Sequence, residues 1–327
     1  MLSKAREKVR AVTFHKPGLA TFIETDIPSP GYDEVLVRMK ACGICKYDIK
    51  TLKDLTENPR YSERPGHEGV GVLEAVGPGV SDLKPGDKVA TIYLGGAMAS
   101  MYLADLQSVA RIPDTVTEYE LWFAEPITCV VSALRLLSIE PGENVVVLGS
   151  GYMGVLLLQG LPRSYIHHLI VSEPVAARRA LAQKYGAGTV INPETDDVVG
   201  TVLEICGGPV DLVIEASGEP GTIEQGTKML RNGGRLCIFG HHAVDELVPT
   251  NAWHMQGINV LNTTPFTSRD FHKDLVDAVH LMESGVFDQS DLITHTYPFD
   301  DVARAMEETI KHPPGMIKSV LRNYELA

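Results

Sequence analysis

Side chains that can bind a metal ion lie close together in the first quarter of the chain. Cys42 and Cys45 are three positions apart, as in one half of a zinc site, and Asp48 follows them. His67 and Glu68 stand together in a glycine-flanked segment. A structural zinc finger needs a second cysteine pair, which the sequence lacks. We therefore interpret Cys45 as one ligand of a site completed from elsewhere, with Asp48 able to fix the tautomer of the imidazole.

A second segment is suited to binding phosphate. It reads Gly149-Ser150-Gly151-Tyr152-Met153-Gly154. The segment lies between an apolar run typical of a buried strand, 145–148, and an apolar helical run, 155–158. Gly149 suits a tight turn, Gly151 lets a pyrophosphate approach the backbone, and Gly154 allows close packing of helix and strand. A flexible loop is the alternative for such a motif, but this context favours a dinucleotide at a helix N-terminus.

The next predicted strand, 169–171, is followed by Glu173. An acid about 20 residues after the glycine segment bonds the ribose hydroxyls of NAD and repels the additional phosphate of NADP. The sequence therefore predicts NAD as the cofactor.

Composition limits the class of protein. The 327 residues provide for two domains, and 44% hydrophobic with 22% charged residues is typical of globular proteins. A formal charge of −13 argues against nucleic acid as a partner, which leaves small molecules. The five cysteines are scattered, and neither a secretory signal nor a long apolar span is evident, so we expect a cytoplasmic protein with no membrane partner.

The order of the predicted elements indicates an α/β fold. Short strand-like runs with glycine and proline turns fill residues 9–42 and 72–89. Strands then alternate with helices, which predicts a doubly wound parallel sheet. The predicted strands are 145–148, 169–171, 189–193, 211–218, 234–240 and 258–262.

These motifs, in this order, resemble the zinc-dependent medium-chain alcohol and polyol dehydrogenases. The resemblance rests on G-I-C-x-x-D at 43–48, G-H-E at 66–68, G-D-x-V at 86–89 and the glycine segment, and it covers nearly the whole chain. The sorbitol and threonine dehydrogenase branches look closest, because Glu125 precedes Pro126 where the alcohol dehydrogenase branch has a third zinc cysteine. The cysteine-rich lobe that often holds a structural zinc is missing, which predicts a single zinc.

The resemblance implies a Rossmann nucleotide domain, 127–265, inserted into a β-rich GroES-like catalytic domain of residues 1–126 and 266–327. It implies one catalytic zinc bound by Cys45, His67 and Glu125, with Glu68 as a fourth or exchangeable ligand. In the alternative interpretation, Cys45 is a small buried side chain and Glu125 a solvated helix residue. Cys42 is expected not to bind zinc.

The resemblance also assigns cofactor contacts. Lys318 matches a basic residue on the pyrophosphate, and Ser217, Gly218 and Gly240 match the crevice that holds the nicotinamide. His241, His242 and His254 are candidates for substrate contacts, but we expect them to be solvated loop residues and leave them out of the site. Members of the family commonly pair nucleotide domains through a sheet edge, which implies a homodimer or homotetramer joined at 258–262.

The implied reaction is hydride transfer between NAD and a secondary alcohol, such as a polyol, sugar derivative or amino alcohol. Two positions depart from the family, because Tyr47 and Lys50 replace the usual Ser or Thr and the frequent His of the proton relay. We hypothesise that Tyr47 is the general acid and base, assisted by the charge of Lys50. Alternatively, Tyr47 only shapes the pocket, and water or Glu68 carries the proton. An NADPH-linked carbonyl reductase and a non-catalytic nucleotide- or zinc-binding protein are the other functional alternatives.

Overall fold

The computed structural model describes residues 8–56, 58–92, 95–264 and 268–324. The chain forms two compact units, of which the first combines Met1–Thr128 with Asp270–Ala327 and the second is Cys129–Arg269. The sequence predicts the first domain boundary at 126/127, and the structure has it after Thr128. The second predicted boundary, 265/266, falls outside the described residues. The second unit is therefore an insertion in the chain of the first unit.

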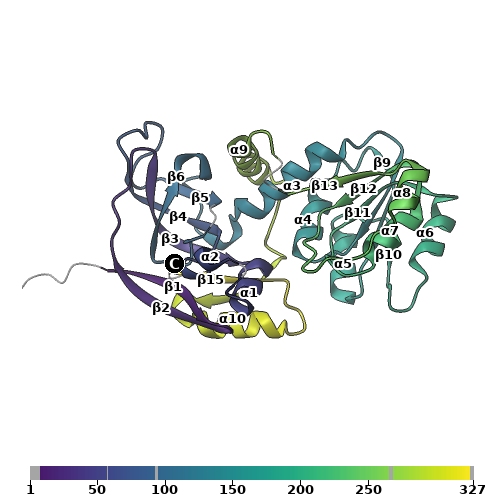
Figure 1. The fold of residues 1–327 in the computed structure, drawn as a ribbon. Helices are drawn as coiled ribbons and strands as arrows, with labels where there is room; N and C mark the ends of the chain where they lie inside the picture. Colours follow the sequence, from purple (N-terminus) through teal and green to yellow (C-terminus); the bar gives the residue numbers. More distant parts are fainter. Residues whose placement is uncertain (1–7, 57, 93–94, 265–267, 325–327) are drawn as a thin grey trace, which may run out of the picture. The chain divides into compact units, whose positions relative to one another are not determined.

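The first unit is built on a seven-stranded sheet (Figure 1). Its strand order is β14-β15-β3-β4-β5-β7, with β6 paired to β3. The strands are β3 (Glu34–Ile44), β4 (Glu68–Val76), β5 (Lys88–Ile92), β6 (Met101–Asp105), β7 (Val109–Arg111), β14 (Ile293–Pro298) and β15 (Lys318–Arg322). A separate hairpin consists of β1 (Lys8–Lys16) and β2 (Leu19–Asp26).

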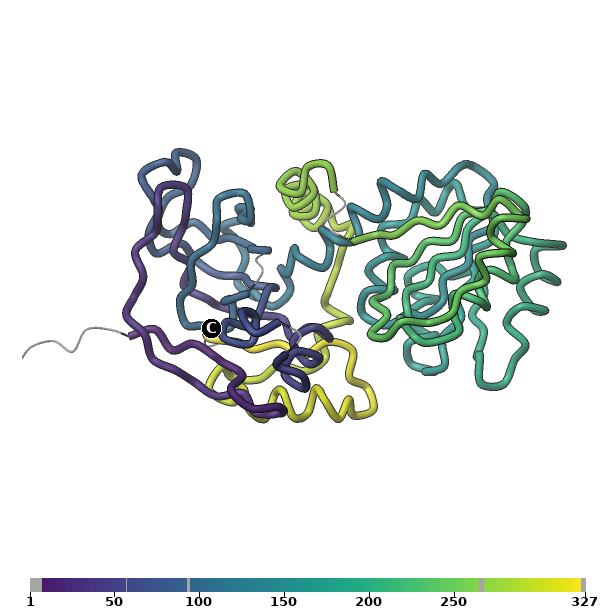
Figure 2. Tube along the Cα trace, viewed as in Figure 1, coloured from purple at the N-terminus to yellow at the C-terminus, as the bar shows by residue number. Residues whose placement is uncertain are grey.

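Described segments from the first and the last part of the sequence pack together in this unit. Figure 2 shows the purple hairpin of β1 and β2 beside the yellow C-terminal segment. Phe22 packs edge-on against Phe299 with ring centroids 5.1 Å apart. The last strand, β15, pairs antiparallel with β3, so that Ser319 lies opposite Ile44. The strand that ends just before Cys45 is therefore paired with the C-terminal strand.

Helices and 3-10 turns complete the first unit. Helix α1 follows β3 directly, and α2 is a short helix with proline at its first position, where a missing N–H costs nothing. The helices are α1 (Lys46–Lys53), α2 (Pro59–Glu63), α9 (Phe271–Glu283) and α10 (Val302–Lys311), and the turns are η1 (Leu106–Ser108), η2 (Tyr119–Leu121) and η4 (Phe299–Asp301).

The second unit confirms the predicted doubly wound architecture. Its six strands are all parallel, in the order β10-β9-β8-β11-β12-β13. The strands are β8 (Glu143–Leu148), β9 (Ile166–Ser172), β10 (Thr189–Ile191), β11 (Val210–Glu215), β12 (Leu230–Ile238) and β13 (Asn259–Asn262). The helices are α3 (Ala124–Leu137), which begins in the first unit, α4 (Tyr152–Gly160), α5 (Ala176–Lys184), α6 (Val198–Cys206), α7 (Thr222–Met229) and α8 (Thr250–Gln256).

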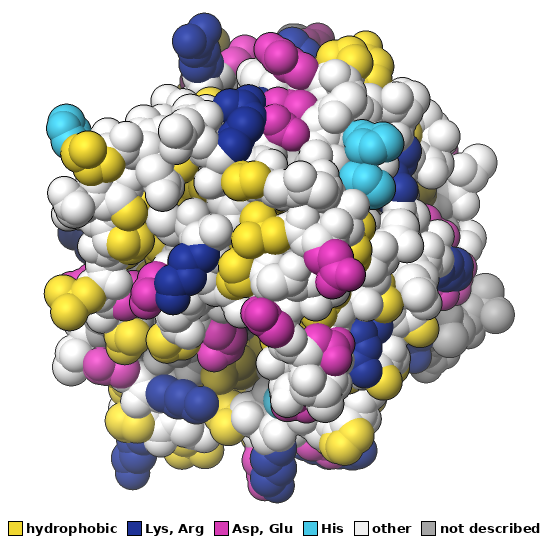
Figure 3. Space-filling model, turned by 90° about the vertical axis from the view of Figure 1, so that its right-hand side faces the viewer, with side chains coloured by type: hydrophobic (Ala, Val, Ile, Leu, Met, Phe, Trp, Pro, Cys, Tyr) yellow, Lys and Arg dark blue, Asp and Glu magenta, His cyan; other side chains and the backbone are white. Residues whose placement is uncertain are grey.

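Burial of apolar side chains explains why the predicted strands form. In β8, Val145, Val146 and Val147 are fully buried, as expected for a strand inside a parallel sheet. Figure 3 shows one face of the molecule, on which acidic, basic and apolar side chains are interspersed. No helix within the described residues is both long and apolar enough to cross a membrane.

Candidate functional site

Three predicted metal ligands come together in the first unit. Among the described residues, the ligand atoms of Cys45, His67 and Glu68 lie within 4.8 Å of one another. Cys45 and His67 are half-buried, and Glu68 is 2% exposed. Thiolate, imidazole and carboxylate together form a donor set that suits zinc. The side chains present therefore fit the metal that the sequence predicts.

Pairing of β3 with β4 explains how these ligands meet. Cys45 follows the last residue of β3, Glu68 is the first residue of β4, and Gly43 lies directly opposite Glu68. A Cβ atom on Gly43 would lie 2.0 Å from Oε2 of Glu68. Glycine at position 43 therefore leaves the space that the Glu68 carboxylate occupies.

The buried carboxylate of Asp48 holds both sides of the ligand group. Its Oδ2 accepts a 2.7 Å hydrogen bond from the N–H of Cys45, the N-cap residue of α1. Its Oδ1 accepts from the Tyr61 hydroxyl at 2.5 Å and from the N–H of Gly66 at 3.2 Å. The Tyr61 oxygen also lies 2.5 Å from Nδ1 of His67. Asp48 thus reaches the imidazole through Tyr61, a residue that the sequence did not single out.

The electrostatics of the group favour positive charge. Burial lowers the pKa of His67, but the negative groups of Cys45, Asp48 and Glu125 outweigh it and hold the pKa well above its ordinary value. Glu125 lies in the first turn of α3. The charge of Glu125 therefore acts on His67. Glu125 is not one of the three residues whose ligand atoms lie within 4.8 Å of one another. Direct binding of zinc by Glu125 stays a prediction.

Lys318 is in contact with the ligand group. Its side chain is 5% exposed, and its ammonium donates to Oε1 of Glu68 at 2.6 Å and lies 2.5 Å from Oε2. Burial lowers the pKa of Lys318, but the charges of Glu68 and Cys45 outweigh it and raise the pKa. The lysine therefore stays charged and balances Glu68. Its expected contact with the cofactor pyrophosphate stays a prediction.

Tyr47 lies beside the same group. Its ring centroid is 5.0 Å from that of Tyr61 and 6.3 Å from that of His67. The amide nitrogen of Asn58 donates to the Tyr47 oxygen at 3.2 Å. The amide oxygen of Asn58 accepts from the N–H of Tyr61 at the start of α2, which determines how the amide is oriented. Lys50, the other changed relay position, lies half-buried on α1.

The glycine segment of the second unit has the predicted turn between β8 and α4. Gly149 has φ of +95°, which favours glycine. A Cβ on Gly154 would lie 2.3 Å from the carbonyl oxygen of Gly149, so helix and strand pack closely there. A Cβ on Gly151 would meet only the Arg178 guanidinium, at 3.9 Å. Tyr152 and Met153 form the first turn of α4 and are half-buried.

Glu173 follows β9 beside this turn. It is 3% exposed, and its carboxylate accepts from the N–H of Ser150 at 2.9 Å and from the N–H of Val175 at 3.0 Å. The Glu173 carboxylate therefore joins the turn after β8 to the segment before α5. Its expected contact with the ribose hydroxyls stays a prediction.

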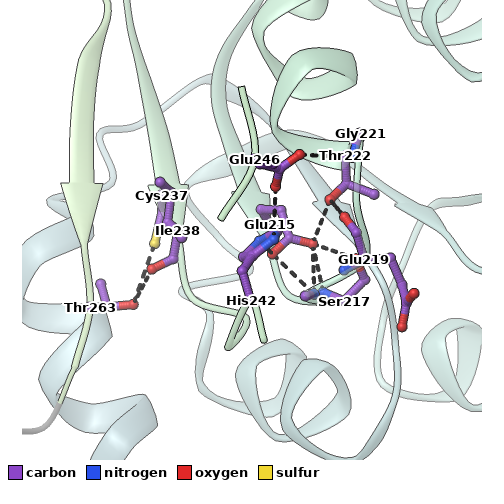
Figure 4. A network of polar contacts seen from close by, with 11 residues as sticks. Glu215, Ser217, Glu219, Gly221, Thr222, Cys237, Ile238, His242, Glu246 and Thr263 are labelled. Carbon is purple, nitrogen blue, oxygen red and sulfur yellow. Dashed lines mark hydrogen bonds and ion pairs between the residues drawn. The ribbon is translucent and has the colours of Figure 1, made fainter. Parts of the chain in front are cut away.

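The buried carboxylate of Glu215 binds the segments that follow β11 and β12 (Figure 4). Glu215 accepts from the N–H groups of Ser217, at 2.8 Å, and Gly218, at 3.1 Å, while Nε2 of His242 lies 2.8 Å away. A Cβ on Gly240 would lie 2.5 Å from Oε2 of Glu215, so only glycine fits there. The expectation that His242 is solvated was wrong, because this carboxylate binds it and its side chain is 14% exposed.

His241 is exposed in the loop after β12, as expected, and His254 is also exposed but lies in α8, not in a loop. Glu215 was missed because a single acid at a strand end has no distinctive spacing in the sequence.

Comparisons with known proteins agree with both units. Residues 31–114 match the alcohol dehydrogenase GroES-like domain, and residues 138–281 match the zinc-binding dehydrogenase family. The L-threonine 3-dehydrogenase of Caldanaerobacter subterraneus subsp. tengcongensis is 31% identical, covering 93% of this chain and 96% of the relative. An alcohol dehydrogenase of Geobacillus stearothermophilus is 28% identical, covering 88% and 92%. The crystal structure of an Escherichia coli oxidoreductase of unknown specificity, 23% identical, gives a TM-score of 0.88 over 98% of this chain and all of that chain.

The cysteines allow a chemical test of the ligand assignment. We expect iodoacetamide to alkylate half-buried Cys45 in metal-free native protein, and added zinc to protect it. Burial raises the pKa of Cys42 well above its usual value and that of Cys237 to about 12, so both thiols should stay unmodified in either state. Peptide mass spectrometry measures the labelling, and Cys206, half-buried in the other unit, is the control. Equal labelling of Cys45 with and without zinc would contradict its role as a ligand.

Proposed function

Because the chain belongs to the zinc-dependent medium-chain dehydrogenase/reductase family, and is an oxidoreductase of alcohols, we propose that it transfers a hydride between a secondary alcohol and NAD. The observation that supports this most is the grouping of Cys45, His67 and Glu68 in the unit that carries the GroES-like match. We include polyols, sugar derivatives and amino alcohols in the substrate class. A similarity to L-threonine 3-dehydrogenase supports this range without selecting one substrate.

In this proposal, Cys45 and His67 hold the zinc together with Glu125, and Glu68 is a fourth or exchangeable ligand. Zinc, when bound, supplies a Lewis acid that polarises the alcohol or carbonyl oxygen of the substrate. The Lys318 ammonium holds the Glu68 carboxylate in place and offsets its charge. Asp48 fixes the backbone of Cys45 and, through Tyr61, the ring of His67.

Tyr47 is the proposed general acid and base. Asn58 donates to its oxygen, which leaves the phenolic hydrogen available for a second partner. In alcohol oxidation the phenol oxygen takes the hydroxyl proton while its own hydrogen passes to water, and in carbonyl reduction both transfers run in the opposite direction. The alternative, in which Tyr47 only shapes the pocket and water or Glu68 carries the proton, gives Asn58 no chemical role.

For the cofactor, we propose that Gly149–Gly154 holds the pyrophosphate of NAD and that Ser217 and Gly240 line the nicotinamide site. When bound, the nicotinamide accepts or returns the hydride. Glu173 supports NAD over NADP, because a 2′-phosphate would meet a buried carboxylate. An NADPH-linked carbonyl reductase is therefore the second candidate, and a non-catalytic zinc- or nucleotide-binding protein is the third.

A substrate panel tests the function. Purified protein with about one zinc per chain should form NADH from at least one polyol, sugar, amino sugar or threonine, and form NADPH at least about tenfold more slowly because of Glu173. Absorbance at the reduced-nicotinamide band measures both rates. Preference for NADPH would favour the reductase. Zinc-bound protein without any substrate across the pH range would count against the enzyme, and zinc-free protein that binds NADH would leave only a binding role.

Replacing the proposed acid and base tests its role. Tyr47→Phe should lower kcat by about a hundredfold or more, because general acid and base catalysis contributes that much, while zinc content stays unchanged. Steady-state rates across the pH range measure the effect. The matched control is Tyr32→Phe, a 70% exposed tyrosine of the same unit, which should keep normal turnover. Near-normal turnover of Tyr47→Phe at every pH would favour the pocket-shaping alternative.

We also propose that two copies pair through β13 to give a homodimer or homotetramer. β13 is the outer strand of its sheet, and its residues are exposed or half-buried, so its outer edge can accept another strand. Light scattering during gel filtration should give two or four times the chain mass of 35.6 kDa. Elution at the mass of a single chain would refute the pairing.

A further inference from the structure

Tyr61 stands between a buried carboxylate and a proposed zinc ligand. It is 4% exposed, and its oxygen lies 2.5 Å from Oδ1 of Asp48 and 2.5 Å from Nδ1 of His67. The N–H of Gly66 also points at this oxygen, at 3.1 Å. Asp48 itself is fully buried. The phenol therefore links two groups that the sequence led us to expect in direct contact.

The chemistry of the groups fixes the direction of each hydrogen bond. Three donors converge on Asp48, namely the Tyr61 hydroxyl and the N–H groups of Cys45 and Gly66, which suits an ionised carboxylate that only accepts. The phenol has one hydrogen and gives it to Asp48. Toward His67 its oxygen must then accept, so Nδ1 carries the hydrogen. In the neutral imidazole that binds a metal, the lone pair of His67 is consequently on Nε2.

The position of Tyr61 is itself well determined. Its backbone N–H is held by the amide oxygen of Asn58 at the start of α2, at 3.2 Å. Its ring packs edge-on against Tyr47, with centroids 5.0 Å apart and planes at 72°. Donation to a carboxylate also makes the phenol oxygen a stronger acceptor, because hydrogen bonds in a chain polarise one another. These contacts suit a group that orients another side chain.

We propose that Tyr61 is a positioning residue of the metal site, which transmits the charge of Asp48 to His67 and so fixes the ring orientation and the Nε2-binding tautomer. This deepens the proposed function, because it rests on His67 binding zinc. The arrangement is a carboxylate–phenol–histidine chain in place of a direct carboxylate–histidine bond. Partners of this kind commonly change metal affinity by about 10- to 100-fold when removed.

Zinc affinity tests the proposal without substrate. Tyr61→Phe keeps the ring and removes the hydroxyl, and we expect it to weaken zinc binding by about tenfold or more in competition with a chromophoric chelator. The matched control is Tyr102→Phe, which removes another buried phenol hydroxyl of the same unit, bonded to Thr91, and should keep wild-type zinc affinity. Equal zinc affinity of Tyr61→Phe and wild type would overturn the proposal and leave the proposed function standing.

A double-mutant cycle separates transmission from packing. Asp48→Asn should also weaken zinc binding, and combining it with Tyr61→Phe should add little, because both substitutions break the same chain. If the two losses in binding free energy simply add, Asp48 and Tyr61 act separately and the proposal is wrong. Thermal unfolding of the metal-free variants shows that each one folds.

Nuclear magnetic resonance of the zinc-loaded wild type needs no substitution. With ¹⁵N-labelled histidine, the ring of His67 should carry its hydrogen on Nδ1 and bind the metal through Nε2. A hydrogen on Nε2 would overturn the inference even if the variants failed to fold. Wild-type protein that binds no zinc would overturn both this inference and the proposed function, whereas the other outcomes concern Tyr61 alone.

Discussion

The buried carboxylate of Asp48 connects the two chain segments that carry the proposed metal ligands. It binds the N–H of Cys45 on one side, and the Tyr61 hydroxyl and the N–H of Gly66 on the other. Burying a carboxylate without partners is costly. Asp48 can occupy its buried position because these three donors bind it. The segment after β3 and the segment before β4 are therefore held together by Asp48. This one carboxylate fixes the positions of the proposed ligands on both segments.

The same principle operates in the second unit, where Glu215 collects the loops that follow β11 and β12. In both places a buried acid accepts from backbone N–H groups that lie outside the strands and so ties an irregular segment to its neighbours. The two acids differ in what they organise. Asp48 orients the proposed metal ligands, while Glu215 fixes backbone around Ser217 and Gly240, where the proposed cofactor contacts lie.

Much of the fold follows from local pattern. The apolar run at 145–148 predicts β8 because a strand inside a parallel sheet is buried on both sides. Gly149 predicts a tight turn because glycine adopts positive φ more readily than other residues, and its φ in the structure is +95°. Metal-ligand types at Cys45, His67 and Glu68 predict the donor group. Tyr61 and Asn58 were not predictable, because residues 54–64 lack periodicity and the partners of these side chains are set by tertiary contacts. His242 was misjudged for the same reason.

The contact between Lys318 and Glu68 joins positions 250 residues apart. The entropic cost of closing so long a loop is only about 0.6 kcal/mol greater than that of a loop half as long. Contacts between residues this far apart in the sequence nevertheless form slowly. On the ribosome, Cys45, His67 and Glu68 all emerge before the whole nucleotide unit, and Lys318 emerges after it. During most of synthesis the Glu68 carboxylate therefore lacks the Lys318 ammonium that balances its charge. The proposed ligand group is consequently more negative in the growing chain than in the complete protein.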